Sequence, residues 1–142
     1  MSTIVVGVDQ STEAKAALRF ALQEAQFRGA RLLAVHAIDP FSTYPSLAVD
    51  VSAVHGAAAQ LLEDATSDVN GEGNGVKIER RVVEGAPGAV LVEESREADL
   101  LVVGSRGHGG FVGLLLGSVS QQCAHHAKCP VVIVRQQSTK SD

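Results

Sequence analysis

The chain has 142 residues and a mass of 14.8 kDa, which suits one domain with a single buried core. A net charge of −4 and an aromatic content of 4% without tryptophan argue against a partner such as nucleic acid or an anionic membrane. Two cysteines are too few for a disulfide framework, the first residues lack the features of a signal peptide, and no apolar run could span a bilayer; together these observations predict a cytoplasmic protein.

The first half of the chain predicts two strand and helix pairs. The apolar run over residues 3–8 is typical of a strand buried on both faces of a parallel sheet. Ser11 or Thr12 can cap an amphipathic helix, in which small and apolar residues recur at helical spacing until Gly29. Residues 31–38 predict a second strand, and a loop with two prolines then leads to a helix over about residues 50–69.

The second half predicts three further strands. Residues 76–83 mix apolar side chains with four charged ones, which indicates a strand at the edge of a sheet. A helix then begins near Pro87 and runs to residue 98, followed by a strand over 100–103, a helix over 118–127 and a last strand over 131–134. We assign residues 1–135 to the domain and residues 136–142 to a polar, disordered tail.

The order of these elements predicts an α/β fold. Five strands separated by four crossovers, three of which hold clear helices, favour a single parallel sheet with about four helices on both faces. In such sheets a ligand lies beyond the carboxyl ends of the strands, where the strand order reverses. With the strand order 3-2-1-4-5, this crevice would lie between Asp9, after the first strand, and Gly104, after the fourth.

A glycine-rich stretch after the fourth strand predicts a phosphate-binding loop. Its glycines allow the backbone to approach an anion closely, and the helix expected from Ser118 would direct its unpaired N–H groups at the same point. A mobile linker is the alternative, but a linker would need no helix start beyond it. The stretch has no Gly-Lys-Ser/Thr of a Walker loop, and the turn after the first strand does not match a dinucleotide-binding motif.

The spacing of the glycines resembles a family motif. Gly104-x-x-Gly107, nine intervening residues and Gly117-Ser118 are similar to the nucleotide motif of the universal stress protein family. The resemblance continues at residues 5–11, 35–37, 99–103 and 129–134, and so covers nearly the whole chain. It implies a fold like that of the adenine nucleotide α-hydrolases, membership of the ATP-binding subgroup, and a homodimer that pairs through the last strand, Val131–Val134.

The resemblance also implies where an adenine nucleotide would bind. Asp9 and Ala37 would lie against the adenosine, and Ser118 with Ser120 would donate hydrogen bonds to phosphate oxygens, through which Mg²⁺ could also be held. Ala37 is smaller than the branched residue often found there, which would loosen the adenine pocket. The predicted nucleotide-binding residues are Gly7, Asp9, Ala37, Val103, Gly104, Ser105, Arg106, Gly107, His108, Gly109, Gly110, Gly117, Ser118, Val119 and Ser120.

Structural roles compete with these assignments at several residues. Asp9 could instead cap the first helix, Arg106 could pair with a surface acid, and His36 fits a hydrogen-bonded core histidine better than a ligand. The run from Cys123 through His125 and His126 to Cys129 suggests zinc, but successive helical residues point to different faces and the paired Cys-x-x-Cys spacing is absent. A nucleophile and base formed by Ser118 or Ser120 with His108 would lack a strained nucleophile turn and an orienting acid.

The predicted function is therefore that of an ATP-binding stress protein that responds to energy state, with no catalytic residue assigned. Efficient phosphoryl transfer needs carboxylates that hold a metal, a cationic clamp and a group that orients the attacking atom, whereas the sequence offers Arg106, His108 and hydroxyls. Two alternatives remain open: an enzyme that transfers adenylyl groups or hydrolyses ATP slowly in the same crevice, and a module that binds cyclic AMP or only protein partners.

Overall fold

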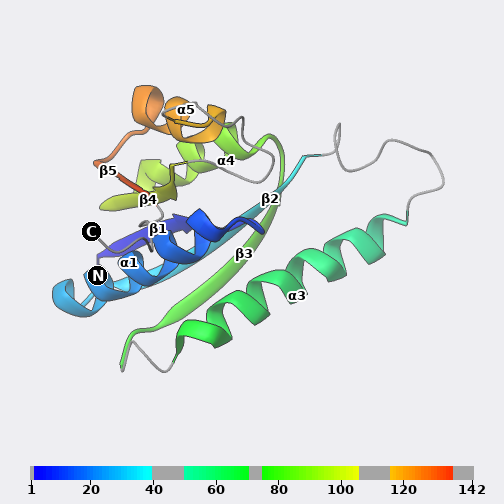
Figure 1. Ribbon diagram of the computed structural model, residues 1–142, viewed down its shortest axis with the longest axis horizontal. Coiled ribbons are helices and arrows are strands. Elements are labelled where there is room, and N and C mark those ends of the chain that lie inside the picture. The colour runs from blue at the N-terminus through cyan, green and yellow to red at the C-terminus, as the bar shows by residue number, and fades with distance from the viewer. Residues whose placement is uncertain (1, 40–49, 71–74, 106–115, 136–142) are drawn as a thin grey trace, which may run out of the picture.

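The sheet of the computed structural model, which describes residues 2–39, 50–70, 75–105 and 116–135, has five parallel strands (Figure 1). Their order is β3-β2-β1-β4-β5, as predicted. The strands are β1 (Thr3–Gly7), β2 (Arg31–Ile38), β3 (Ile78–Glu84), β4 (Leu100–Gly104) and β5 (Val131–Val134). The helices are α1 (Thr12–Arg28), α3 (Val51–Asn70), α4 (Pro87–Glu94) and α5 (Ser118–His126), with a short 3₁₀ helix at Ser95–Glu97.

In the described part of the chain, α1 and α3 cover one face of the sheet and α4 and α5 cover the other (Figure 1). On one face Ile4 of β1 is buried with Leu18 of α1 and Leu62 of α3. On the opposite face Val5 is buried with Leu91 of α4 and with residues of α5. Because neighbouring residues of one strand enter different cores, the central strands need apolar side chains at every position. This explains the continuous apolar runs from which the parallel sheet was predicted.

Helix α1 begins and ends at the predicted signals. The hydroxyl of Ser11 accepts a hydrogen bond from the N–H of Ala14 at 3.1 Å, which makes Ser11 the N-cap. Gly29 ends the helix in the left-handed conformation, with φ of 63°. These two residues fix the length of the helix that starts at the carboxyl edge of β1.

The third predicted helix is shorter than expected. Helix α4 ends at Glu94 and gives way to the 3₁₀ turn, whereas the sequence suggested helix as far as residue 98. The buried side chain of Ser95 accounts for the change, because its hydroxyl donates to the carbonyl of Val92 at 2.6 Å and accepts from the N–H of Lys128 at 2.8 Å. Ser95 thereby ties the end of α4 to the segment that leads into β5.

Strand β3 lies at an edge of the sheet, as its charged residues predicted. Its side chains form ion pairs with neighbouring elements, including Arg31 with Glu79 at 3.1 Å and Arg81 with Glu94 at 2.7 Å. The strand begins at Ile78, two residues later than expected. The charges of β3 therefore keep one open edge of the sheet polar.

Three predictions fall outside the described residues: the loop over 40–49, most of the glycine loop over 106–115 and the tail over 136–142. Within the described ranges, no helix is long and apolar enough to cross a membrane.

Candidate functional site

The carboxyl ends of β1 and β4 lie side by side at the point where the strand order reverses. The two strands are paired in parallel, with Ile4 opposite Leu100 and Val6 opposite Val102. Asp9 follows β1 and Ser105 follows β4, so both residues lie at the same edge of the sheet. This is the position at which a doubly wound sheet binds its ligand.

Asp9 is fixed by the first turn of α1. Its Oδ1 atom accepts hydrogen bonds from the N–H of Ser11 at 2.8 Å and from the hydroxyl of Ser11 at 2.5 Å. The same hydroxyl accepts from the N–H of Ala14, so the carboxylate, the serine and the helix start form one chain of hydrogen bonds. The structural role considered for Asp9 is therefore present, as a support for the Ser11 cap. Its contact with adenosine stays a prediction.

Helix α5 presents an N-terminus without a side-chain cap. Gly117 is the N-cap residue, in extended backbone with φ of −77°, and has no side chain that could accept from the first N–H groups. Gly117 is buried, whereas the side chain of Ser118 is exposed. Ser118, Val119 and Ser120 supply the first N–H groups of the helix, which have no intrahelical acceptor. These groups and the helix dipole favour an anion at this end of α5.

Ser105 and Ser120 hold the two ends of the glycine loop together. The carbonyl of Ser105 accepts from the N–H of Gly117 at 2.7 Å and from the hydroxyl of Ser120 at 2.7 Å. The Ser120 hydroxyl lies 3.0 Å from the carbonyl of Gly117 as well, and its side chain is only 1% exposed. In this arrangement Ser120 binds main-chain carbonyls, so the contact with phosphate that we predicted for it would require its hydroxyl to turn away from them.

Three further residues of the predicted site pack against the helices. A Cβ atom at Gly104 would lie 2.8 Å from the Cβ of Glu13, and one at Gly7 would lie 2.7 Å from Cδ1 of Leu91. Val103 is buried in the core beneath α4 and α5. These residues bring the helices close to the strand ends, and the structure gives each of them a packing role.

Ala37 lies just beyond the end of the ladder between β1 and β2. Gly7 opposite Val35 is the last pair of this ladder, and the N–H of Val8 still donates to the carbonyl of Val35 at 2.8 Å. The next residue of β2, His36, places Nδ1 2.8 Å from the carbonyl of Val8, which confirms that this histidine is hydrogen-bonded within the fold. Ala37 is half-buried and belongs to the strand that continues past β1.

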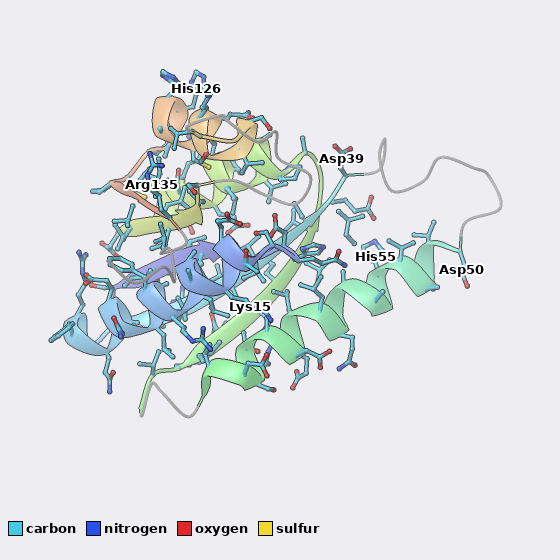
Figure 2. All side chains as sticks on the ribbon, viewed as in Figure 1. Lys15, Asp39, Asp50, His55, His126 and Arg135 are labelled. Atoms are coloured by element: carbon cyan, nitrogen blue, oxygen red, sulfur yellow. The ribbon has the colours of Figure 1, made fainter. Side chains whose placement is uncertain are left out.

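The cysteine and histidine residues of α5 point in different directions. Cys123 is fully buried, whereas His125 and His126 are exposed, and His126 points away from the sheet (Figure 2). Burial, followed by the nearby Cys129, raises the pKa of Cys123 to about 11. Burial first and the charge of Asp99 second also raise the pKa of Cys129. Among the described residues no three side chains of His, Cys, Asp or Glu are arranged to hold a metal ion.

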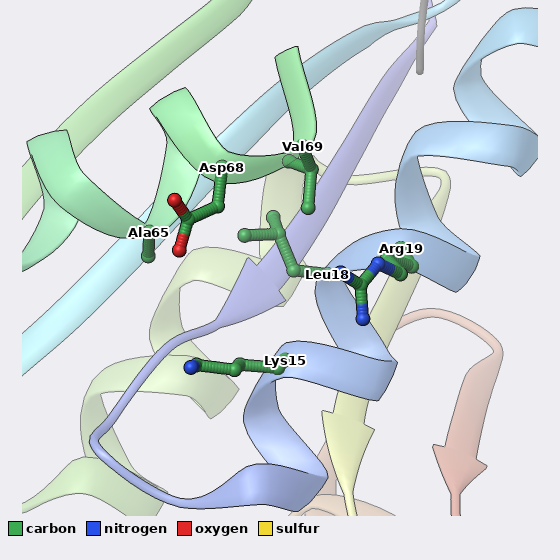
Figure 3. Close-up of a pocket in the computed structure, with 6 residues that line it drawn as sticks. All are labelled: Lys15, Leu18, Arg19, Ala65, Asp68 and Val69. Atoms are coloured by element: carbon green, nitrogen blue, oxygen red, sulfur yellow. The ribbon is translucent and has the colours of Figure 1, made fainter. Parts of the chain in front are cut away.

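A separate pocket of about 260 Å³ opens between α1 and α3 (Figure 3). It lies on the face of the sheet covered by these two helices and includes no residue of the predicted nucleotide site. Its lining residues are Lys15, Leu18, Arg19, Ala65, Asp68 and Val69.

The central part of the predicted phosphate loop is outside the described residues. Arg106, Gly107, His108, Gly109 and Gly110 all fall in this range, and their roles stay predictions. The described part of the site thus consists of Asp9, Ala37, the end of β4 and the start of α5.

Comparison with known proteins identifies the family. Residues 1–135 match the sequence model of the universal stress protein family. The chain belongs to this family. A universal stress protein of Mycobacterium tuberculosis is 37% identical over 136 residues, which cover 96% of this chain and 46% of that protein. The chain spans about half the length of the curated relatives that it matches.

Two solved universal stress proteins resemble the chain over nearly its full length. One is a universal stress protein in complex with cAMP, which is 34% identical with a TM-score of 0.71 and covers 94% of this chain and 96% of its own. The other comes from Archaeoglobus fulgidus in complex with dAMP, is 26% identical with a TM-score of 0.70, and covers 94% of this chain and 98% of its own. These two members of the family each hold an adenine nucleotide in their structures.

Proposed function

We propose that this universal stress protein is a cytoplasmic, ATP-binding regulator that responds to energy state. The observation that carries the proposal is the uncapped N-terminus of α5, which is joined through Gly117 and Ser105 to the carboxyl end of β4. Unpaired N–H groups at a helix start attract an anion, and a glycine at the N-cap leaves room for one. The phosphates of the nucleotide would bind here.

The adenosine would bind at the neighbouring strand ends. Asp9 can accept hydrogen bonds from ribose hydroxyls or an adenine amine, and its hydrogen bonds with Ser11 hold the carboxylate before a ligand arrives. Ala37 would contact the base. The relatives in complex with cAMP and dAMP support an adenine nucleotide as the ligand, because both of those ligands contain adenine and a phosphate.

We propose ATP as the nucleotide because the glycine motif, from Gly104 to Ser118, offers more groups than one phosphate needs. Arg106, Gly107 and His108 would surround the ribose and the phosphates, together with Gly104 and Gly117. The exposed hydroxyl of Ser118 would donate to a phosphate oxygen. A Mg²⁺ ion would be held through phosphate oxygens, since hard cations prefer oxygen ligands. Hydroxyls and main-chain N–H groups hold phosphates without supplying the groups that efficient phosphoryl transfer needs, so we propose binding without rapid turnover.

Calorimetric titration of nucleotide-free protein tests the proposal. With the protein at tens of micromolar in the calorimeter cell, we expect ATP to give a measurable heat of binding. We also expect ATP to bind more tightly than cAMP, because cAMP lacks the outer phosphates. Absence of heat with ATP, AMP and cAMP alike would disprove a nucleotide site. Pyrophosphate release that depends on an acceptor would instead favour an adenylyl-transfer enzyme, and tighter binding of cAMP would reassign the ligand.

We also propose that the chain forms a homodimer through β5. All four residues of this strand, Val131–Val134, are apolar and only half-buried, although β5 lies at an edge of the sheet. Val132 and Val134 pack toward one core, and Val131 and Ile133 pack toward the other. An apolar edge strand is a ready template for pairing with another chain. A second copy of β5 would cover it.

Replacing Ile133 with proline should separate the dimer. The carbonyl of Pro130 accepts from the N–H of Leu101 in β4, and the carbonyl of Val134 accepts from the N–H of Ser105, just after β4. Because main-chain groups alternate along a strand, the N–H of Ile133 points to the open edge. Proline removes this donor and spares the ladder with β4. Light scattering should give twice 14.8 kDa for the parent chain and a single chain mass for Ile133→Pro. Ile133→Ala, which keeps the N–H, is the control, and an unchanged mass for Ile133→Pro would argue against pairing through β5.

A further inference from the structure

Strand β1 ends one residue earlier than its sequence predicts, and the side chain of His36 contacts the main chain of the next residue, Val8. Residues 3–8 form one apolar run, but the strand ends at Gly7. Val8 still donates its N–H to the carbonyl of Val35, as the next step of a ladder would require. The carbonyl of Val8, however, lies 2.8 Å from Nδ1 of His36.

The contact fixes the tautomer of the imidazole. A carbonyl oxygen can only accept a hydrogen bond, so Nδ1 must carry the proton and donate it. In a parallel ladder the main-chain groups of Val35 and Ala37 point to the same neighbouring strand. The partner that a longer β1 would offer to the N–H of Ala37 is the carbonyl of Val8, which the His36 side chain holds.

We propose that His36 is a positioning residue that ends the β1–β2 ladder at Gly7 and thereby shapes the adenosine side of the crevice. By binding the carbonyl of Val8, the imidazole turns the chain out of the sheet one residue before Asp9. The main chain of Ala37 is then left beside the crevice, with no β1 residue paired opposite it. His36 thus acts on the ligand through Asp9 and Ala37. The part of this inference that concerns affinity rests on the proposed function.

Two spectroscopic measurements on the full chain test the contact without any ligand. Long-range ¹H–¹⁵N correlation should show His36 as the tautomer protonated at Nδ1; protonation at Nε2 alone would overturn the inference. In His36→Leu the N–H of Ala37 should pair with the carbonyl of Val8, and its hydrogen exchange should slow by roughly tenfold or more. Unchanged exchange at Ala37 in this variant would also overturn the inference.

A conservative variant separates positioning from simple packing. Asparagine carries an amide N–H at the same number of bonds from Cβ as Nδ1 of histidine, so His36→Asn should restore the exchange rate of Ala37. Val82→Ala is the matched packing control. Val82 lies on β3 and is paired with His36, but strand β2 separates it from Val8. Exchange at Ala37 could instead slow in Val82→Ala, or slow in His36→Asn as much as in His36→Leu. Either result would show that packing, and not the donated hydrogen bond, controls the ladder.

Affinity for AMP then connects the contact to the site. Titration should show a loss of roughly tenfold in His36→Leu, which corresponds to one net hydrogen bond, and near-parent affinity in His36→Asn and Val82→Ala. A parent chain that binds no nucleotide would contradict the proposed function, while the tautomer and the exchange of Ala37 would still decide the role of His36. A parent chain that binds AMP and a His36→Leu variant that binds it equally well would contradict the effect of His36 on the site.

Discussion

Gly117→Val should abolish nucleotide binding while leaving the fold intact. The N-cap position has φ of −77°, which valine can adopt, so the main-chain conformation does not require glycine. The added branched side chain would stand at the start of α5, where the proposed phosphate meets the first N–H groups. Hydrogen bonds to a charged phosphate contribute about 1.5–3 kcal/mol each, and loss of two predicts an affinity at least roughly 100-fold lower. Calorimetric titration with ATP measures this loss.

A second glycine provides the control for this variant. Gly56 lies in α3, and a Cβ atom there would meet nothing within 4 Å. Gly56→Val should keep the parent affinity, and both variants should keep the parent circular dichroism spectrum. Full affinity in Gly117→Val would show that phosphate binds elsewhere, whereas a lost helical spectrum would show that the variant had failed to fold.

The sequence was sufficient to predict the fold because each element carries a local signal. The two faces of the sheet are both covered, so the central strands are apolar throughout, and the charged residues of β3 marked it as an edge. Ser11 and Gly29 defined α1 by their cap chemistry. The predicted end of α4 was wrong, because the observed end depends on a contact between Ser95 and Lys128, which are far apart in the sequence.

The candidate site was less predictable because side chains predicted to bind a ligand also make contacts within the fold. Ser118 and Ser120 were both expected at phosphate, yet residues two apart on a helix point to different sides. The structure accordingly exposes Ser118 and buries Ser120 against Ser105. Helical geometry alone could have separated the two serines. The contact of His36 with Val8 had no such local signal, since it joins two strands.

Gly104→Ala should destabilise the protein through the start of α1. The new Cβ would lie 2.8 Å from the Cβ of Glu13, 3.0 Å from its carbonyl carbon and 3.1 Å from its carbonyl oxygen. Two of these atoms belong to the main chain of a helix, so the whole first turn would have to move. Overpacking of this kind costs about 2 kcal/mol, more than the entropy that alanine saves over glycine in the unfolded chain. Urea unfolding should show this loss.

Gly7→Ala is the matched comparison, because Gly7 ends the neighbouring strand β1 and is equally crowded. Its new Cβ would lie 2.7 Å from Cδ1 of Leu91, the end of a side chain that can rotate. We therefore expect Gly7→Ala to lower the free energy of unfolding by less than Gly104→Ala does. Displacement of the first turn of α1 would also move Ser11, on which the position of Asp9 depends, so Gly104→Ala should weaken ATP binding as well. A Gly104→Ala variant as stable as the parent chain would mean that the approach of α1 to β4 does not require glycine.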